Sequence, residues 1–194
     1  MPAAASVDLY WLPLGAGGHF VRLNGRVYEA LAAARQRRER FDLYHSALEV
    51  AIPDGTYVIE MAPIPDAAGD SRGVVGEGPV GSRLTQRLRL FRYDVRRWLG
   101  GSIPDLAEAV ESPQRVSTDP AAATRILALV PEVPTLVWGR DELRVRDMWN
   151  SNSLISWLLA RSGVGFDSVH LPSGGRAPGW HAGIALAERQ GHSR

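Results

Sequence analysis

The chain has 194 residues, of which 45% are hydrophobic and 22% are charged, and it carries a formal net charge of +1 and no cysteine. Length and composition predict one globular domain over residues 1–194. The charge excludes a whole-molecule field that recruits nucleic acid, and the lack of cysteine excludes disulfides, thiolate metal sites and a cysteine nucleophile. All 22 basic residues are arginine, which excludes Schiff-base lysine chemistry.

The first residues, MPAAASVDLYWLP, have neither a basic segment nor a long apolar segment of the kind found in signal peptides. No run of about 18 apolar residues occurs that could span a bilayer. We therefore expect a cytoplasmic protein without a membrane span, and the sequence leaves the oligomeric state open.

The N-terminal third predicts strands around one helix. Residues 8–14 (DLYWLPL) indicate a short aromatic strand, and GAGG at 15–18 indicates a turn. Apolar residues recur at helical spacing over 26–40 and predict a helix there. An alternating segment at 42–52, the turn sequence Pro-Asp-Gly and an apolar segment at 56–64 predict a β-hairpin.

The middle of the chain predicts a flexible glycine-rich loop at 66–82 and a half-exposed strand at 87–98, where arginine alternates with apolar residues. A short helix or turn is expected at 103–110. Thr-Asp-Pro then begins a predicted helix at 118–130.

The C-terminal part predicts a buried helix at 154–162 that ends at Gly163, a loop at 171–180 and a brief helix at 182–189. Residues 188–194 are expected to fray. Helices and strands alternate without a regular βαβ rhythm, so we predict an α+β fold, an antiparallel sheet packed against helices.

Three further patterns are weak indications. GEGPVG at 76–81 matches the dinucleotide-binding motif, but the following residues leave too little room for the crossover helix, which favours a loop. RQRRER at 35–40 is typical of a solvated helix end rather than a nucleic-acid site. The five histidines show no close ligand spacing, so no metal site and no cofactor are predicted.

The stretch NSNS at 150–153 raises a choice, because four small polar residues stand where a buried helix begins. One of them suffices as an N-cap. The surplus favours a second interpretation, in which a serine hydroxyl beside free helix N–H groups acts as nucleophile next to an oxyanion hole.

His45 stands at the start of the strand 42–52 and is a candidate general base held by rigid backbone. The alternative is a half-buried histidine with a structural role. Glu49 is too far along the strand to orient the ring, whereas Glu60 on the partner strand or Asp42 could do so.

A histidine at a strand start, then a hairpin, then an Asn-Ser-Asn-Ser element opening an apolar helix resembles the circularly permuted papain-like superfamily, which includes PPPDE peptidases, lecithin:retinol acyltransferase-like proteins and permuted NlpC-type amidases. YHSALEV and NSNSLISWLL carry this resemblance. It implies a permuted papain-like fold with His45 as base, Ser151 in the nucleophile's place and Asn150 and Asn152 beside it. The family usually has cysteine at the nucleophile position, and serine requires a well-placed base and oxyanion hole.

Two functions are therefore expected from the sequence. The first is a hydrolase or acyltransferase that acts on an amide, peptide or ester through a His45–Ser151 dyad, with Ser153 as a second, more structural hydroxyl. The second is an inactive module of the same fold that binds a peptide or small ligand between the helix and the hairpin, lined by Trp11, Trp149 and Trp180. A distance under about 4 Å between the His45 ring and the Ser151 hydroxyl would favour the dyad. The third alternative is that the two motifs do not meet in space.

Overall fold

The computed structural model describes residues 4–14, 41–64 and 73–192. The predicted turn at 15–18, the predicted helix at 26–40 and its basic end lie outside these ranges. Within them, strands and helices form the predicted α+β arrangement, with one sheet and three α-helices.

Six strands form the main sheet in the order β4-β5-β3-β2-β1-β6, and every neighbouring pair is antiparallel. Their bounds are β1 Ser6–Pro13, β2 Asp42–Ile52, β3 Gly55–Pro63, β4 Val74–Pro79, β5 Arg92–Leu99 and β6 Gln114–Ser117. A two-residue strand, β7 (Gly175–Arg176), adds to the start of β2 in parallel. The β2–β3 hairpin confirms the prediction for 42–64.

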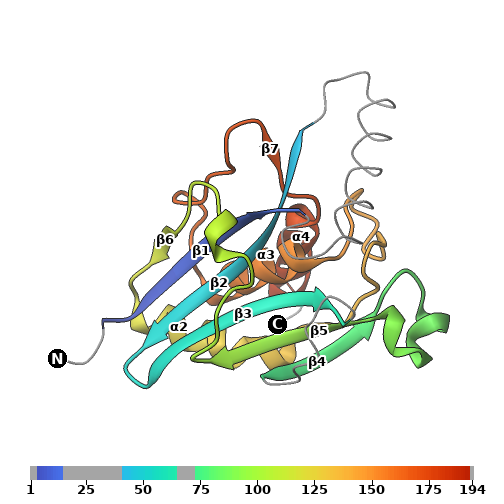
Figure 1. The fold of residues 1–194 in the computed structure, drawn as a ribbon, viewed down its shortest axis with the longest axis horizontal. Coiled ribbons are helices and arrows are strands. Elements are labelled where there is room, and N and C mark those ends of the chain that lie inside the picture. Colours follow the sequence, from blue (N-terminus) through green and yellow to red (C-terminus); the bar gives the residue numbers. More distant parts are fainter. Residues whose placement is uncertain (1–3, 15–40, 65–72, 193–194) are drawn as a thin grey trace.

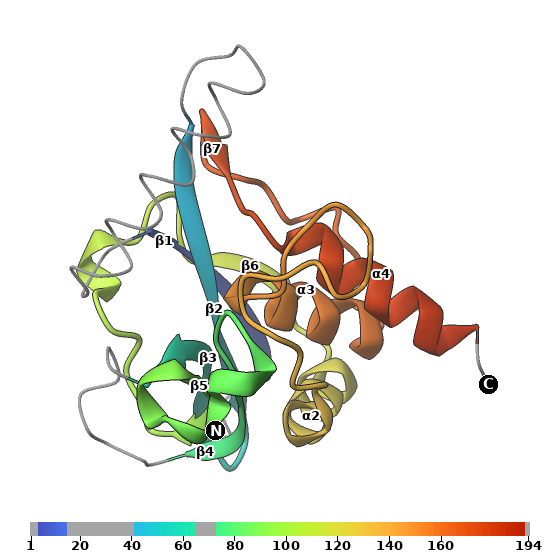
Figure 2. The same cartoon turned by 90° about the vertical axis from the view of Figure 1, so that its right-hand side faces the viewer.

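Three α-helices, α2 (Pro120–Leu129), α3 (Ser151–Ser162) and α4 (Trp180–Gly191), cover one face of the sheet (Figure 2). The helix predicted at 118–130 is confirmed, and the Asp119 carboxylate accepts hydrogen bonds from the first backbone amides of α2. Gly163 ends α3 in the left-handed conformation, as expected. The predicted last helix is longer than expected, because α4 continues to Gly191 through residues predicted to fray.

The alternation of side chains assigns each strand residue to one of two faces. Trp11 of β1, Leu48 and Val50 of β2, Ile59 of β3 and Val95 of β5 all join the core beneath the helices. A smaller apolar cluster occupies the opposite face, where the segment between β5 and β6 covers it; its members are Tyr10, Leu12, Ala47, Val58 and Ile103. This division of faces decides where every candidate site residue points.

Two predictions between β3 and β5 were wrong. The loop expected at 66–82 contains β4, an edge strand, and Gly78 belongs to it because a Cβ there would lie 2.2 Å from the Tyr93 ring. The glycine motif at 76–81 thus serves strand packing. The strand predicted at 87–98 begins only at Arg92, because residues 83–91 form two short 3-10 turns, η1 (Arg83–Arg87) and η2 (Arg89–Phe91).

Smaller differences occur elsewhere. The helix or turn expected at 103–110 is a single 3-10 turn, η3 (Leu106–Glu108), and another, η4 (Val130–Glu132), follows α2. The strand β6 was not predicted. No helix in the ranges 4–14, 41–64 and 73–192 is both long and apolar enough to cross a membrane.

Candidate functional site

The first residues of α3 form a buried polar network. Asn150 is the N-cap, and its side-chain oxygen accepts from the amides of Asn152 (2.9 Å) and Ser153 (3.4 Å). In return, the Ser153 hydroxyl accepts from the Asn150 amide at 3.1 Å, which completes a capping box. Two of the helix N–H groups expected to form an oxyanion hole are therefore already occupied.

Asn152 connects α3 to two other segments. Its side-chain nitrogen donates to the Tyr44 carbonyl (2.9 Å) and to the Pro178 carbonyl (2.8 Å), while its side-chain oxygen accepts from the Ser46 hydroxyl (2.8 Å). The residue is 1% exposed. This one amide thus holds β2 and the loop before α4 against the helix.

Ser153 and Ser156 bind α3 to the start of α4. The Ser153 hydroxyl lies 2.8 Å from the Gly179 carbonyl and 3.0 Å from the Met148 carbonyl, and the Ser156 hydroxyl donates to the Trp180 carbonyl at 2.8 Å. Ser153 is fully buried. This geometry supports a structural role for the Ser153 hydroxyl.

Ser151 differs from its neighbours. It is 3% exposed, and its hydroxyl has no recorded hydrogen bond to any residue of the described ranges. It occupies the first helical position, so its backbone amide lies before the two amides that Asn150 caps. Among the residues 150–153, Ser151 alone has a side chain that forms no hydrogen bond with the described part of the chain.

The structure does not bring His45 together with Ser151. The side chain that β2 presents to α3 at this level is Ser46, through its bond to Asn152. His45 pairs with Leu12 in a regular antiparallel register, and both point to the opposite face of the sheet. The sheet therefore separates the imidazole from the helix, which corrects the predicted dyad.

The surroundings of His45 also weaken it as a base. Burial lowers the pKa of His45 to about 4, so the ring is neutral and weakly basic at pH 7. Glu60, its predicted orienting partner, does lie on the same face, but its carboxylate faces Arg96 at 3.7 Å. Burial raises the pKa of Glu60, and the adjacent Arg96 acts against this rise.

The three tryptophans predicted to line a ligand cleft belong to the core instead. Trp11 and Trp149 are at most 1% exposed. Trp180 packs on the Trp11 ring at a centroid distance of 5.1 Å and against Phe166 at 6.1 Å. The side chains by which α3 and the hairpin meet, such as Leu48, Ile59 and Leu158, belong to the same buried core.

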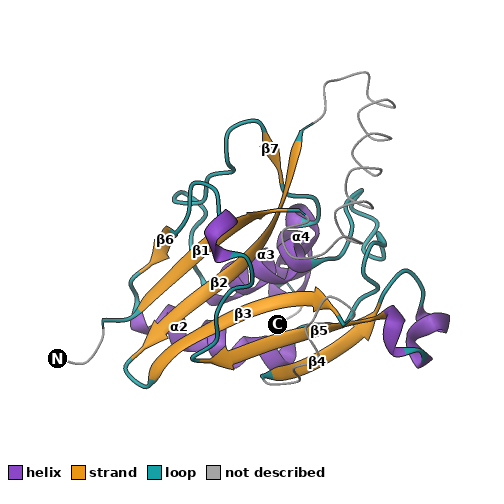
Figure 3. Cartoon of the chain, in the orientation of Figure 1, coloured by secondary structure: helices purple, strands orange, loops and turns teal. Residues whose placement is uncertain are grey.

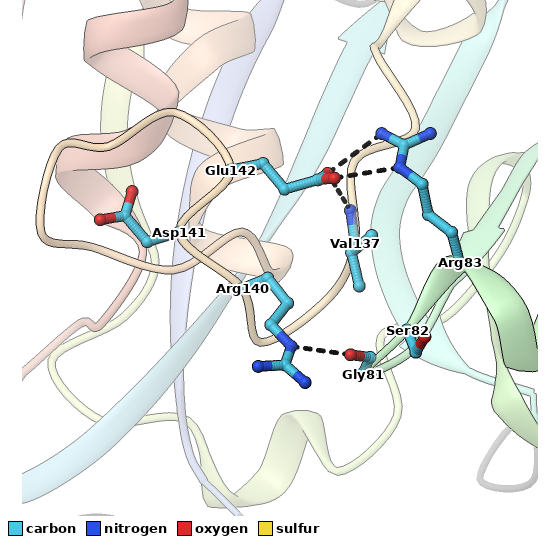
Figure 4. A pocket seen from close by; sticks show the side chains of 7 residues that line it. All are labelled: Gly81, Ser82, Arg83, Val137, Arg140, Asp141 and Glu142. Atoms are coloured by element: carbon cyan, nitrogen blue, oxygen red, sulfur yellow. Dashed lines mark hydrogen bonds and ion pairs between the residues drawn. The ribbon is translucent and has the colours of Figure 1, made fainter.

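A different hollow, of about 510 Å³, lies between the end of β4 and the loop that precedes α3 (Figure 4). Its lining residues are Gly81, Ser82, Arg83, Val137, Arg140, Asp141 and Glu142. None of these was predicted as a site residue, because the hollow joins two segments distant in sequence, and Gly81 belongs to the glycine motif at 76–81 that was interpreted as a loop.

An ion pair forms one wall of the hollow. Arg83 meets Glu142 through two hydrogen bonds of 3.0 and 3.2 Å, and Glu142 also accepts from the Val137 amide at 2.8 Å. The hydrogen bond from Arg83 lowers the pKa of Glu142, burial acts against it, and the Val137 amide lowers the pKa further. This wall is electrically neutral.

Arg140 is the second cation of the hollow. Its Nε donates to the Gly81 carbonyl at 2.7 Å, and no ion pair to Arg140 is recorded within the described part of the chain. The neighbouring Asp141 carboxylate accepts from the Val145 and Arg146 amides instead, and Figure 4 shows it turned away from the Arg140 side chain. The terminal nitrogens of Arg140 remain available to an anion.

Among the described residues, no three histidine or carboxylate side chains gather as a possible metal-ligand set. No family model, no curated protein and no solved structure matches the chain.

Proposed function

We propose that the protein is a non-catalytic binding module that holds a small anionic ligand, or a peptide through a carboxylate, at Arg140. The observation that carries the first half of this proposal is the phase of β2: Ser46, not His45, faces α3. The Ser151 hydroxyl therefore lacks, on its own side of the sheet, the histidine that the resemblance implies as its activating base.

The resemblance to the permuted papain-like superfamily enters the proposal through the order of the elements. A strand with a histidine precedes a helix that opens on Asn-Ser-Asn-Ser, and the two elements pack together through Ser46 and Asn152. The histidine is one residue out of phase with that contact. We infer a papain-like arrangement in which the pair of motifs has kept its packing role without a catalytic dyad.

The chemistry of the hollow supports an anionic ligand. Arg83 pairs with Glu142, and the Asp141 carboxylate accepts from amides of its own loop, so Arg140 is a guanidinium of the hollow without a carboxylate partner among the described residues. A guanidinium presents paired N–H groups in a fixed fork that matches a carboxylate or phosphate. A volume of about 510 Å³ is in the range of small-molecule sites.

The ligand test is a titration of the full chain with inorganic phosphate and with a short peptide bearing a free carboxyl terminus, followed by amide NMR shifts at Gly81 and Val137. Arg140→Gln should weaken binding about tenfold or more, because a hydrogen bond to a charged group contributes about 1.5–3 kcal/mol. Arg144→Gln removes the same charge from an exposed position outside the hollow and should change little. Equal weakening by both variants would contradict a site at Arg140.

A serine hydrolase is the second candidate, and one observation favours it: the Ser151 hydroxyl is the only one of the three at the start of α3 not engaged in the described network. A fluorophosphonate probe distinguishes the two functions. The binding module predicts no labelling of the native chain. Labelling that disappears in Ser151→Ala, with an unchanged melting temperature, would replace the proposal with the enzyme.

A further inference from the structure

The connection between β4 and β5 presents apolar side chains to solvent. Residues 83–91, here called the tip, extend beyond the ends of these two strands as the turns η1 and η2 (Figures 1 and 3). Leu84 is 90% exposed, Leu88 60% and Leu90 65%, and Phe91 is 37% exposed. Isolated exposed leucines are ordinary, but a cluster of this kind on a projecting element marks an interaction surface.

The tip is also positively charged. No acidic residue occurs between Glu77 and Asp94, while four arginines do. The outer two are paired with the body of the protein, Arg83 with Glu142 and Arg92 with Glu77. Arg87 and Arg89 alternate with Leu88 and Leu90, and the described residues provide no ion pair for either.

We propose that the tip inserts its leucines into the surface of an anionic lipid bilayer while Arg87 and Arg89 bind the lipid headgroups. Charge complementarity identifies the occupant, because two unneutralised guanidinium groups flank the exposed apolar side chains. Arginine keeps its charged head in water while its stem lies along apolar surface, so both residue types can be satisfied at one interface.

Two features of the tip favour a membrane over a protein surface. It is a projection rather than a groove, so a protein partner would have to supply a matching acidic cavity. A second copy of the chain meeting it symmetrically would bring Arg87 and Arg89 against the same cations. A fluid anionic surface accommodates a convex basic and apolar projection without either requirement.

This inference goes beyond the proposed ligand site and does not depend on it. The net charge of +1 provides no long-range attraction of the whole molecule, so binding should rest on the tip alone. Membrane attachment of this kind needs no spanning helix, and its electrostatic part should weaken as salt concentration rises.

The test is sedimentation of the full chain with vesicles of phosphatidylcholine, with and without phosphatidylserine. The native chain should bind the vesicles that contain phosphatidylserine. Arg87→Gln with Arg89→Gln should weaken this binding by about 30-fold, since each cation near an anionic surface typically contributes about fivefold. Leu88→Asp with Leu90→Asp should abolish it.

Matched controls remove the same groups elsewhere. Arg144→Gln with Arg146→Gln changes the net charge equally, and Leu171→Asp replaces a leucine of the 164–179 loop that is 47% exposed. Both should bind like the native chain. No binding by the native chain, or equal loss in the control and tip variants, would overturn the proposal, as would tip variants that lose binding to a soluble acidic peptide but not to vesicles.

A second readout places the contact. The chain has no cysteine, so Leu88→Cys provides a single attachment site for a polarity-sensitive fluorophore. Its emission should shift to the blue on addition of phosphatidylserine vesicles, whereas the same fluorophore at Leu171→Cys should not respond. A response at Leu171 without one at Leu88 would overturn insertion of the tip.

Discussion

The start of α3 buries polar side chains, whereas the tip at 83–91 exposes apolar ones. At α3, Asn152 and Ser153 are at most 1% exposed and bonded to carbonyls of other segments, whereas at the tip Leu84 is 90% exposed. From hydropathy alone, the polar residues would be expected at the surface and the leucine in the core. Buried polar groups need hydrogen-bond partners, so they favour one particular packing of the segments. Exposed apolar groups gain free energy only when a partner removes them from water.

This contrast separates architecture from interaction. The polar residues that resemble a catalytic motif hold β2, α3 and the start of α4 together, and the side chains available to other molecules lie at the tip and at Arg140 of the hollow. Both of the latter project from loops joined to the rigid sheet, where binding residues commonly occur. Substitutions at the two kinds of region should therefore separate stability from binding.

The largest effect is expected at Asn152. Asn152→Ala removes the partner of the Tyr44 carbonyl and of the Ser46 hydroxyl, both buried, and opens a small cavity at the same place. Each unsatisfied buried group costs about 1–3 kcal/mol, so the free energy of unfolding should fall by about 4 kcal/mol. Urea denaturation measures this change, and a loss below about 1 kcal/mol would mean that the network does not hold these segments.

The contact between α3 and α4 depends on Gly183. A Cβ at this position would lie 2.1 Å from the Ser153 carbonyl oxygen and from the Ser156 hydroxyl. Gly183→Ala should therefore push the helices apart and destabilise the protein by about 3 kcal/mol, although alanine has the higher helix propensity. Gly191→Ala, at the exposed end of the same helix, meets no atom within 4 Å and is the control. A stabilised Gly183→Ala variant would contradict this close packing.

His45 should make stability depend on pH. Its folded pKa of about 4 is below the usual 6.5, so the unfolded chain binds a proton between these values and the folded chain does not. The contribution of His45 to the free energy of unfolding is therefore fully present above about pH 6.5 and is lost as pH falls toward 4. The full loss would be about 1.4 kcal/mol for each pH unit between the two pKa values. Because the His45 side chain is partly exposed, we expect a smaller total loss, on the order of 2 kcal/mol.

His45→Gln isolates this contribution. Thermal unfolding of the native chain and the variant should converge as pH is lowered from 7 to 4, because only the native chain loses the histidine contribution. Glu60 acts in the opposite direction, since its raised pKa lets the folded chain take up a proton first, but it is common to both proteins. Parallel pH profiles would contradict a buried neutral His45.

The sequence predicted the parts of the fold that depend on local signals. The β2–β3 hairpin followed from alternation and a Pro-Asp-Gly turn, and α2 followed from the cap at Asp119. The strand β4 was missed because three of its residues are Gly or Pro and its pairing partner lies on the far side of the tip. Alternation in RLRLFR predicted a strand where the chain forms 3-10 turns, since period-two patterns do not distinguish a half-buried strand from a turn with exposed leucines.

The candidate site was less predictable than the fold, because it depends on which face a residue occupies. The sequence identified the strand of His45 and the helix of Ser151 as neighbours, and they do pack together through Ser46 and Asn152. A shift of one residue along a strand reverses the face, and the alternation that places Leu48 and Val50 in the core places Ser46, not His45, on the side of α3. The cations of the hollow come from loops that only the folded chain brings together.

The smallest effect is expected at Ser151, and it is the most informative. Ser151→Ala removes a hydroxyl that bonds to no described residue, so the free energy of unfolding should change by less than about 0.5 kcal/mol. Ser153→Ala, only two residues further on, deletes the capping-box acceptor and the bond to the Gly179 carbonyl and should cost about 2 kcal/mol. For a protein of this size, that difference corresponds to several degrees in melting temperature. Equal destabilisation by the two substitutions would make Ser151 a member of the network. Its hydroxyl would then have a structural role, as that of Ser153 does, and would no longer stand out as a candidate nucleophile.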